Sequence, residues 1–298
     1  MKHWKPAAIA ALWSGALYAA PMPVVASFSI LGDVAQQIGG ERVGVQNLVG
    51  ANQDAHAYNL TSSDIKKIRE ARLVLLNGLG LEKAELQRAV KQSKVASAEA
   101  TAGIKPLAAD EHHHEHGHDH DHDHGEFDPH VWNDPVLMQR YAANVAIALI
   151  KADPAGSRYY QQRFKDYQNV LNQLNNYANQ QFGAVAPAKR KVLTGHDSFA
   201  YLGKRYQVKF ISPQGVSSEA EPSARQITAI IRQIKAENVK AVFTENIKDG
   251  RMIARIAKET GVKVSGGLYA DALSSGAPAG TYADMFRYNV RVMSEAMK

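Results

Sequence analysis

Short runs of consecutive apolar residues alternate along the chain with segments in which apolar residues recur at helical spacing. Runs that are apolar at every position are typical of strands buried on both faces of a parallel sheet. Strands that alternate with helices indicate βαβ units. The pattern predicts an α/β fold with two related βα lobes, each built on a four-stranded parallel sheet. The predicted strands are Val24–Ile30, Val43–Val49, Leu73–Leu76, Val95–Ala98, Lys191–Thr194, Val208–Ile211, Ala241–Thr244 and Val262–Ser265.

Two helices of the second half carry clear start and stop signals. Ser223 is a suitable N-cap for a helix with one apolar face, formed by Ile227, Ile230, Ile231 and Ile234. The next helix is predicted over Asp249–Thr260 and ends at Gly261. Glycine commonly terminates helices because it adopts the left-handed conformation without steric strain.

A polar stretch between the two halves, residues 153–182, is predicted to form one long helix. It contains no glycine after Gly156 and no proline after Pro154. Its apolar residues keep a helical period: Tyr160, Phe164, Tyr167, Leu171, Leu174 and Tyr177. At about 1.5 Å per residue, such a helix would be on the order of 40 Å long and could serve both lobes as a stiff spine. We therefore expect an N-terminal lobe over residues 21–152, a connecting helix over residues 153–185 and a C-terminal lobe over residues 186–298.

Residues 1–20 have the three-part pattern of a secretory signal peptide. Two lysines supply the positive start, and the largely apolar segment 7–17 follows. This segment is shorter than the roughly 20 residues that a membrane-spanning helix needs. We therefore expect cleavage near Ala19 or Ala20 and export to the periplasm. The sequence contains no cysteine that could carry a lipid at the new terminus.

The composition excludes several classes of protein. Of the 298 residues, 45% are hydrophobic and 21% are charged, a balance typical of globular rather than disordered chains. The absence of cysteine excludes disulfides, thiolate metal ligands and cysteine nucleophiles. A formal net charge of +6 could suggest nucleic acid as a partner. The lysines and arginines are scattered along predicted helix faces, however, so no nucleic-acid partner is expected.

Histidine is concentrated in one segment that has no apolar periodicity. Residues 110–127 are predicted to form a disordered loop inserted into the first lobe. Imidazole alternates there with carboxylate, and imidazole suits zinc, nickel and copper better than manganese or magnesium. An inert, solubilising linker is the alternative interpretation. The eight candidates for weak auxiliary metal sites in this histidine tract are His112, His113, His114, His116, His118, His120, His122 and His124.

Three further histidines and one aspartate follow predicted strands. His56 and His130 follow the second and fourth strands of the first half, while His196 and Asp271 follow the first and last strands of the second half. Ligands of open α/β sheets bind beyond the carboxyl ends of the strands, so these residues are expected to meet in a cleft between the lobes. Imidazole and carboxylate can complete a four-coordinate metal site without thiolate. Each residue alone also has an ordinary explanation, such as a loop hydrogen bond or a helix cap.

The stretches around these candidates resemble the periplasmic metal-binding proteins of ABC importers, the zinc and manganese solute-binding family typified by the ZnuA proteins. The resemblance implies two βα lobes, a long connecting helix and one metal ion in the cleft. It implies His56, His130 and His196 as ligands and Asp271 as a fourth, whereas some zinc members use three histidines and a water. The matching stretches cover nearly the whole mature chain in order: Val24–Asp33, Asp54–Tyr58, Asp128–Trp132, Gly195–Phe199, Glu221–Ser223 and Leu268–Leu273.

Within this family the resemblance favours zinc. Members with glutamate at the third ligand position tend toward manganese, whereas that position is His196 here. A histidine-rich loop just before the second ligand is typical of zinc members. A disulfide that many zinc members carry in the second lobe is absent from this chain. We expect a monomeric, non-enzymatic protein that captures Zn²⁺ and delivers it to an ABC permease, with Mn²⁺ as the alternative cargo.

Three other functions stay open at this point. A manganese or iron importer would use the same fold. A metal buffer or a metal-dependent adhesin, as among the cell-adhesion members of the family, would use the same site. An exported zinc hydrolase would need an open coordination position and a general base, for which Glu245 is the best candidate because it follows a predicted strand.

Overall fold

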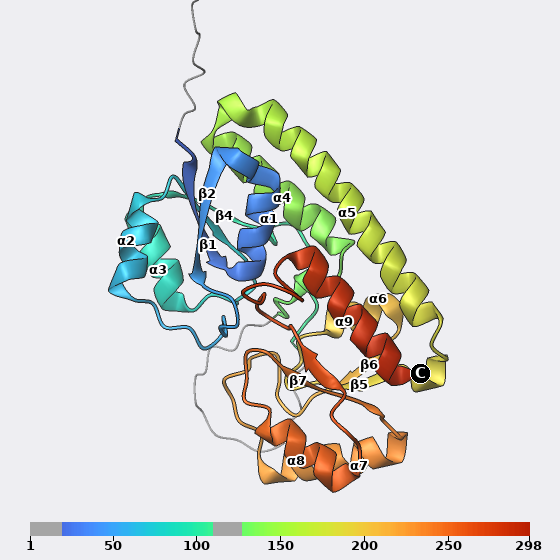
Figure 1. Cartoon of the computed structure of the whole chain (residues 1–298). Helices are drawn as coiled ribbons and strands as arrows, with labels where there is room; N and C mark the ends of the chain where they lie inside the picture. The colour runs from blue at the N-terminus through green and yellow to red at the C-terminus, as the bar shows by residue number, and fades with distance from the viewer. Residues whose placement is uncertain (1–19, 110–126) are drawn as a thin grey trace, which may run out of the picture.

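Two parallel four-stranded sheets form the framework of the molecule in a computed structural model that describes residues 20–109 and 127–298 (Figure 1). Their strand orders are β2-β1-β3-β4 and β6-β5-β7-β8, which is the same topology in both lobes. The predicted fold class is therefore confirmed. The strands are β1 (Met22–Phe28), β2 (Val43–Val49), β3 (Leu73–Leu76), β4 (Ala96–Glu99), β5 (Lys191–Leu193), β6 (Lys209–Ile211), β7 (Ala241–Glu245) and β8 (Gly266–Leu268).

Helices cover both faces of the first sheet. Val24 and Phe28 of β1 pack on the side of α1 (Ser29–Gly39) and α4 (Leu137–Ala152). The neighbouring Val25 packs on the opposite side, in a cluster with apolar residues of α2 (Ser62–Glu70) and α3 (Ala84–Ser93). Successive side chains of a strand point to opposite faces, so a strand buried on both sides must be apolar at every position. This explains the unbroken apolar runs of the sequence.

The second sheet is covered in the same way. Helices α7 (Ala224–Glu237) and α8 (Arg251–Thr260) share a cluster with Leu193 and Val242 on one face. Helices α6 (Ala200–Tyr206) and α9 (Tyr282–Met297) pack on the other. Ser223 caps α7 in a reciprocal capping box with Gln226, and α8 ends at Gly261 with a φ of 73°. Both predicted helix signals are confirmed.

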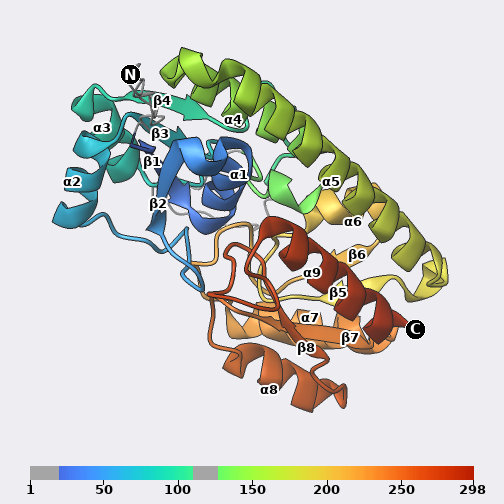
Figure 2. The same cartoon turned by 45° about the horizontal axis from the view of Figure 1, so that its top comes forward.

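The long helix α5 (Ser157–Gly183) runs beside both lobes (Figure 2). It contacts α1 and α4 of the first lobe and α6 and α9 of the second. A 3-10 turn at Pro154–Gly156 precedes it, so the helix is shorter than residues 153–185. Buried residues of both sheets and of α5 belong to one continuous apolar cluster, which joins the lobes over the length of the helix. The lobe boundaries at 152 and 186 remain a proposal.

The prediction of a strand at Val262–Ser265 is wrong. The backbone N–H of Val262 donates instead to the carbonyl of Ala257, which closes the end of α8. Strand β8 therefore begins only at Gly266 and pairs with Phe243–Glu245 of β7. The first strand also ends earlier than expected, because Ser29 and Ile30 already belong to α1.

The segments expected to direct export lie outside the described residues. Most of the expected signal peptide falls in residues 1–19, which the structure does not describe. Within residues 20–109 and 127–298, no helix combines the length and the apolar content that crossing a bilayer would require.

Removal of a buried side chain from α5 would leave a cavity, which is expected to destabilise the whole molecule. Leu171 is completely buried on α5, so Leu171→Ala should lower the free energy of unfolding by about 2–5 kcal/mol. Urea denaturation followed by circular dichroism measures this change. Asn176→Ala, at an exposed position of the same helix, is the control and should stay within about 0.5 kcal/mol of the wild type. Equal losses in the two variants would contradict the role assigned to the buried face.

Candidate metal centre

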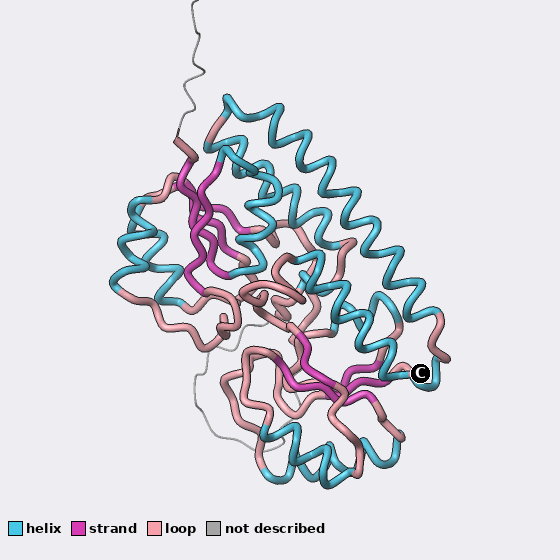
Figure 3. The backbone as a smooth tube through the Cα atoms, in the orientation of Figure 1, coloured by secondary structure: helices cyan, strands magenta, loops and turns pink. Residues whose placement is uncertain are grey.

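The four predicted site residues form one cluster. Each belongs to a loop segment, and Figure 3 shows loops gathered between the two sheets. His56 lies on the loop after β2, and His130 directly precedes a short 3-10 turn at Val131–Asn133. His196 follows β5 and Asp271 follows β8. His56 is 7% exposed, and the other three side chains are fully buried. The structure thus brings together residues that are up to 215 positions apart in the chain (271 − 56).

The distances between their polar atoms suit a single ion. The Nε2 atoms of His56 and His130 lie 3.2 Å apart. The carboxylate of Asp271 lies 3.0 Å from the Nε2 of His196, with the Nε2 atoms of His130 and His56 at 3.4 and 3.5 Å. An ion about 2.1 Å from four tetrahedral ligands would hold them about 3.4 Å apart. A metal ion could therefore sit among these atoms with little movement of the side chains.

Several of these atoms are buried without a hydrogen bond. Three of these atoms have no hydrogen-bond partner in the described part of the chain. They are the two carboxylate oxygens of Asp271 and the Nε2 of His196. Buried polar atoms are nearly always satisfied, and an unsatisfied buried charge is costly. Coordination of a cation would satisfy the oxygens and the ring nitrogen at once.

Two of the three imidazoles are held from behind by carboxylates. The Nδ1 of His130 donates to Asp128 over 2.7 Å, and the Nδ1 of His196 donates to Glu245 over 2.6 Å. In each ring this arrangement leaves Nε2 free to coordinate. Such contacts orient a metal-binding imidazole and make it a stronger ligand. Within residues 20–109 and 127–298, no carboxylate accepts a hydrogen bond from the ring of His56.

The same carboxylates shift the pKa values of the rings. Burial by itself lowers the pKa of His130, but Asp271 and Asp128 raise it to about 9. Burial also opposes the charged form of His196, and Glu245 and Asp271 nevertheless raise its pKa well above the ordinary value. Burial dominates at His56 and lowers its pKa to about 4. The rings of His130 and His196 therefore hold protons at neutral pH, and an ion bound by them would have to displace these protons.

The sequence suggested Glu245 as a candidate general base, but in the structure its carboxylate is a hydrogen-bond partner of His196. One oxygen accepts from the backbone N–H groups of Gly195 and His196, and the other accepts from the His196 ring. This 5% exposed carboxylate is a positioning residue for His196. Asp128 has the same role for His130, and the sequence reasoning missed it. Its signal was the Asp-Pro-His spacing, which places the carboxylate two residues before the imidazole.

The predicted histidine tract belongs to a segment that the structure does not describe. Its members all lie within residues 110–126, outside the described residues: His112, His113, His114, His116, His118, His120, His122 and His124. Their auxiliary metal binding stays a prediction.

Comparison with known proteins identifies the family. The profile of ZnuA, described as zinc-uptake complex component A, periplasmic, matches residues 24–296. The chain belongs to the ZnuA family. This confirms the resemblance found in the sequence.

The relatives of this ZnuA-family chain bind different metals. The manganese-binding lipoprotein MntA of Bacillus subtilis (strain 168) is 32% identical to this chain. The matched region covers 93% of this chain and 90% of MntA. The periplasmic zinc-binding protein TroA of Treponema pallidum has a TM-score of 0.84 at 25% identity, with 93% and 99% of the chains covered. An Mn-bound periplasmic metal-binding protein of Candidatus Liberibacter asiaticus has a TM-score of 0.79 at 28% identity, covering 93% and 100%. The chain is therefore a metal-binding substrate-binding protein of the ABC-importer type.

Loss of the carboxylate behind His196 should weaken metal binding without abolishing it. Glu245→Gln keeps the shape of the side chain but removes its charge, so the affinity for the ion is expected to fall by about 10- to 100-fold. Competition with a chelator measures the change. Glu259→Gln, at a surface ion pair with Arg255, is the matched control and should bind like the wild type. An unchanged affinity in Glu245→Gln would show that His196 needs no such support.

Proposed function

We propose that this protein captures Zn²⁺ in the periplasm and delivers it to the permease of an ABC importer. The observation that carries the proposal is the buried cluster of His56, His130, His196 and Asp271, with its unsatisfied oxygens. These four residues are the proposed metal ligands. Substrate-binding proteins of ABC transporters imply a permease partner, and we propose that the chain meets it as a monomer.

The donor set supports zinc as the cargo. Three neutral imidazoles with one carboxylate suit zinc, which commonly takes four nitrogen and oxygen ligands in a tetrahedral arrangement. The spacing of the polar atoms agrees with bonds of the usual length. The histidine tract is a second argument, because its imidazoles suit the same class of metal.

Manganese or iron is the second candidate, and a specific observation favours it. Both oxygens of Asp271 face the histidines, with Oδ1 near His130 and Oδ2 near His196. Two carboxylate oxygens would raise the coordination number and shift the preference toward harder ions. The names of MntA and of the Mn-bound structure point the same way.

Transport fits the site better than hydrolysis does. A zinc hydrolase needs a coordination position open to substrate and a base that faces it. None of the four candidate ligands is more than 7% exposed, so little of the site is open to a substrate. Both oxygens of Glu245 already accept hydrogen bonds.

Removal of any one histidine should abolish tight binding at the cleft. Each of His56→Ala, His130→Ala and His196→Ala deletes one of four ligands, so we expect a loss of at least about 100-fold in affinity for Zn²⁺. Asp271→Ala should lose less if water takes its place. Titration calorimetry with Zn²⁺ and with Mn²⁺ measures both affinity and preference. Wild-type affinity in all three histidine variants would refute the site. Tighter binding of Mn²⁺ than of Zn²⁺ by the wild type would favour manganese as the cargo.

Metal affinity should rise with pH. Because the carboxylates of Asp271 and Asp128 raise the pKa of His130 to about 9, its ring is protonated in the free protein at neutral pH. Binding must release that proton, so affinity is lost as the pH falls, about tenfold per pH unit for each proton displaced. Calorimetry in buffers of different ionisation enthalpy counts the protons. Affinity independent of pH between about 6 and 8 would contradict this assignment.

A further inference from the structure

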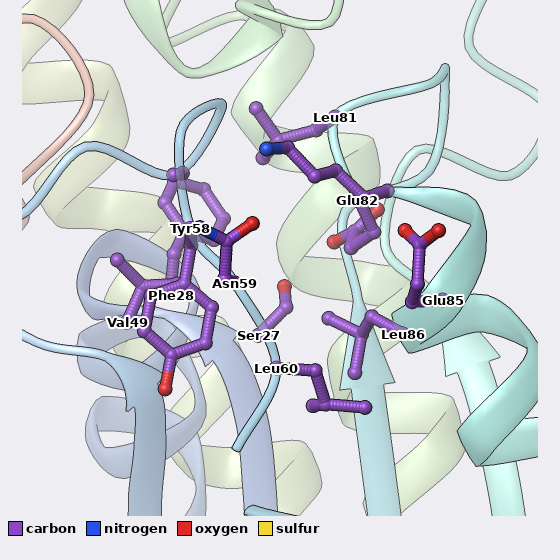
Figure 4. Close-up of a pocket in the computed structure, with 12 residues that line it drawn as sticks. Ser27, Phe28, Val49, Tyr58, Asn59, Leu60, Leu81, Glu82, Glu85 and Leu86 are labelled. Carbon is purple, nitrogen blue, oxygen red and sulfur yellow. The ribbon is translucent and has the colours of Figure 1, made fainter.

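A pocket that is separate from the metal centre lies in the first lobe. It has a volume of about 290 Å³, and none of the four proposed metal ligands lines it. Its lining comes from the ends of β1 and β2, from the loop that follows β2, and from the start of α3 with the residues just before it (Figure 4). All of these segments belong to the first lobe.

The pocket occupies the point at which the strand order of the first sheet reverses. From β1 the chain passes to β2 on one side, and it then returns to β3 on the other side of β1. Strands β1 and β3 are parallel neighbours. In open α/β sheets such a reversal leaves a crevice beyond the carboxyl ends of the strands, and ligands bind there. The topology therefore marks this pocket as a place for a ligand.

Glu82, which lines the pocket, is a buried carboxylate without a positively charged neighbour. It is 5% exposed, and no lysine, arginine or histidine of the described residues forms an ion pair with it. Every other buried carboxylate in the described part of the chain has a basic or imidazole partner. These pairs are Asp64 with Lys67, Asp128 with His130, Asp134 with Arg205, Glu245 with His196, and Asp271 with His56, His130 and His196.

The known partners of Glu82 are neutral. One oxygen accepts the backbone N–H of Asn77 over 2.6 Å, and the other accepts that of Gly78 over 3.0 Å. A carboxylate has about four acceptor positions, so the group can accept further hydrogen bonds. Burial raises the pKa of Glu82, although the hydrogen bonds to its oxygens oppose this shift. A buried charge without a cation is costly, and a cation in the pocket would offset that cost.

Ser27 supplies a second polar group at the same place. Its hydroxyl lies close enough to Glu82 to lower the pKa of that carboxyl in part. The side chain is 2% exposed, yet its oxygen makes no hydrogen bond of ordinary geometry within the described residues. Buried polar atoms without a partner are rare and call for an explanation. A ligand with several donors, such as an ammonium group, could bond to Ser27 and to Glu82 together.

The rest of the lining is largely apolar. Figure 4 shows Phe28 and Val49 on one side of the pocket and Leu86 across from them, with Ser27 in between. Lys83, the basic residue of the lining, already pairs with Glu219 at 2.8 Å. A cavity of about 150 Å³ can hold benzene, so this pocket has room for an aromatic ring with a short chain. The lining thus suits a ligand with an apolar body and one cationic end.

We propose that this pocket binds a small organic cation, namely a primary amine with an apolar body. The ammonium group donates to Glu82 and Ser27, and the apolar part packs against Phe28 and Leu86. This binding site is additional to the metal centre and shares none of its four proposed ligands.

Titration calorimetry with 2-phenylethylamine tests the proposal on the full exported chain. The measurement is made at neutral pH in excess EDTA, so that the amine cannot bind through a metal ion in the cleft. We expect one site with a dissociation constant of about 1 mM or tighter. The uncharged 2-phenylethanol, which has nearly the same shape, should bind at least about tenfold more weakly. Equal affinity for the two compounds, or amine binding only in the metal-loaded protein, would overturn the proposal.

Three variants separate the amine site from a general structural effect. Glu82→Gln should weaken amine binding by about 10- to 100-fold, the effect of losing one charged hydrogen-bond partner. Ser27→Ala keeps the backbone bonds of Glu82 intact and should weaken amine binding by about tenfold, so it tests the site even if Glu82→Gln fails to fold. Glu70→Gln, at a surface pair with Lys66, is the matched control and should bind like the wild type. Wild-type amine affinity in Ser27→Ala, or an equal loss in Glu70→Gln, would contradict the proposed site.

Discussion

Asp271 places a carboxylate in the interior of the molecule with no hydrogen bond to either oxygen from the described residues. Such a group is tolerated only where positive charge offsets it. Without an ion, the nearby imidazoles of His196 and His130 supply that charge by staying protonated, which is why the pKa of Asp271 lies well below its usual range even though burial raises it. A metal ion bound among these residues would replace those protons. The rest of the site is organised around this exchange of protons for metal.

The fold makes this arrangement attainable because both sheets present loops to one cleft. His56 and His130 come from the first lobe, whereas His196 and Asp271 come from the second, so the centre exists only while the lobes are held together. Helix α5 and the continuous apolar cluster supply that constraint. The spine thus contributes to metal binding although none of its residues belongs to the site.

The carboxylate support of the proposed ligands is uneven. Asp128 and Glu245 orient His130 and His196, which would favour tight binding of an ion by these rings. His56 has no such partner among the described residues and lies on a loop beside a pocket. A protein that delivers its cargo must combine affinity with a route for release.

The sequence by itself determined the lobes, the spine and the identities of the four clustered residues. Strands buried on both faces must be apolar throughout, so runs such as Leu73–Leu76 were visible without a structure. It misplaced β8, because the apolar Val262 belongs to the end of α8 and not to the sheet. Glu245 seemed available as a base, and only the folded chain showed both of its oxygens occupied. The Asp54–Ser218 bond joins residues 164 positions apart. Local patterns record which face of an element is buried, but side chains from distant segments become partners only when tertiary packing brings them within hydrogen-bond distance.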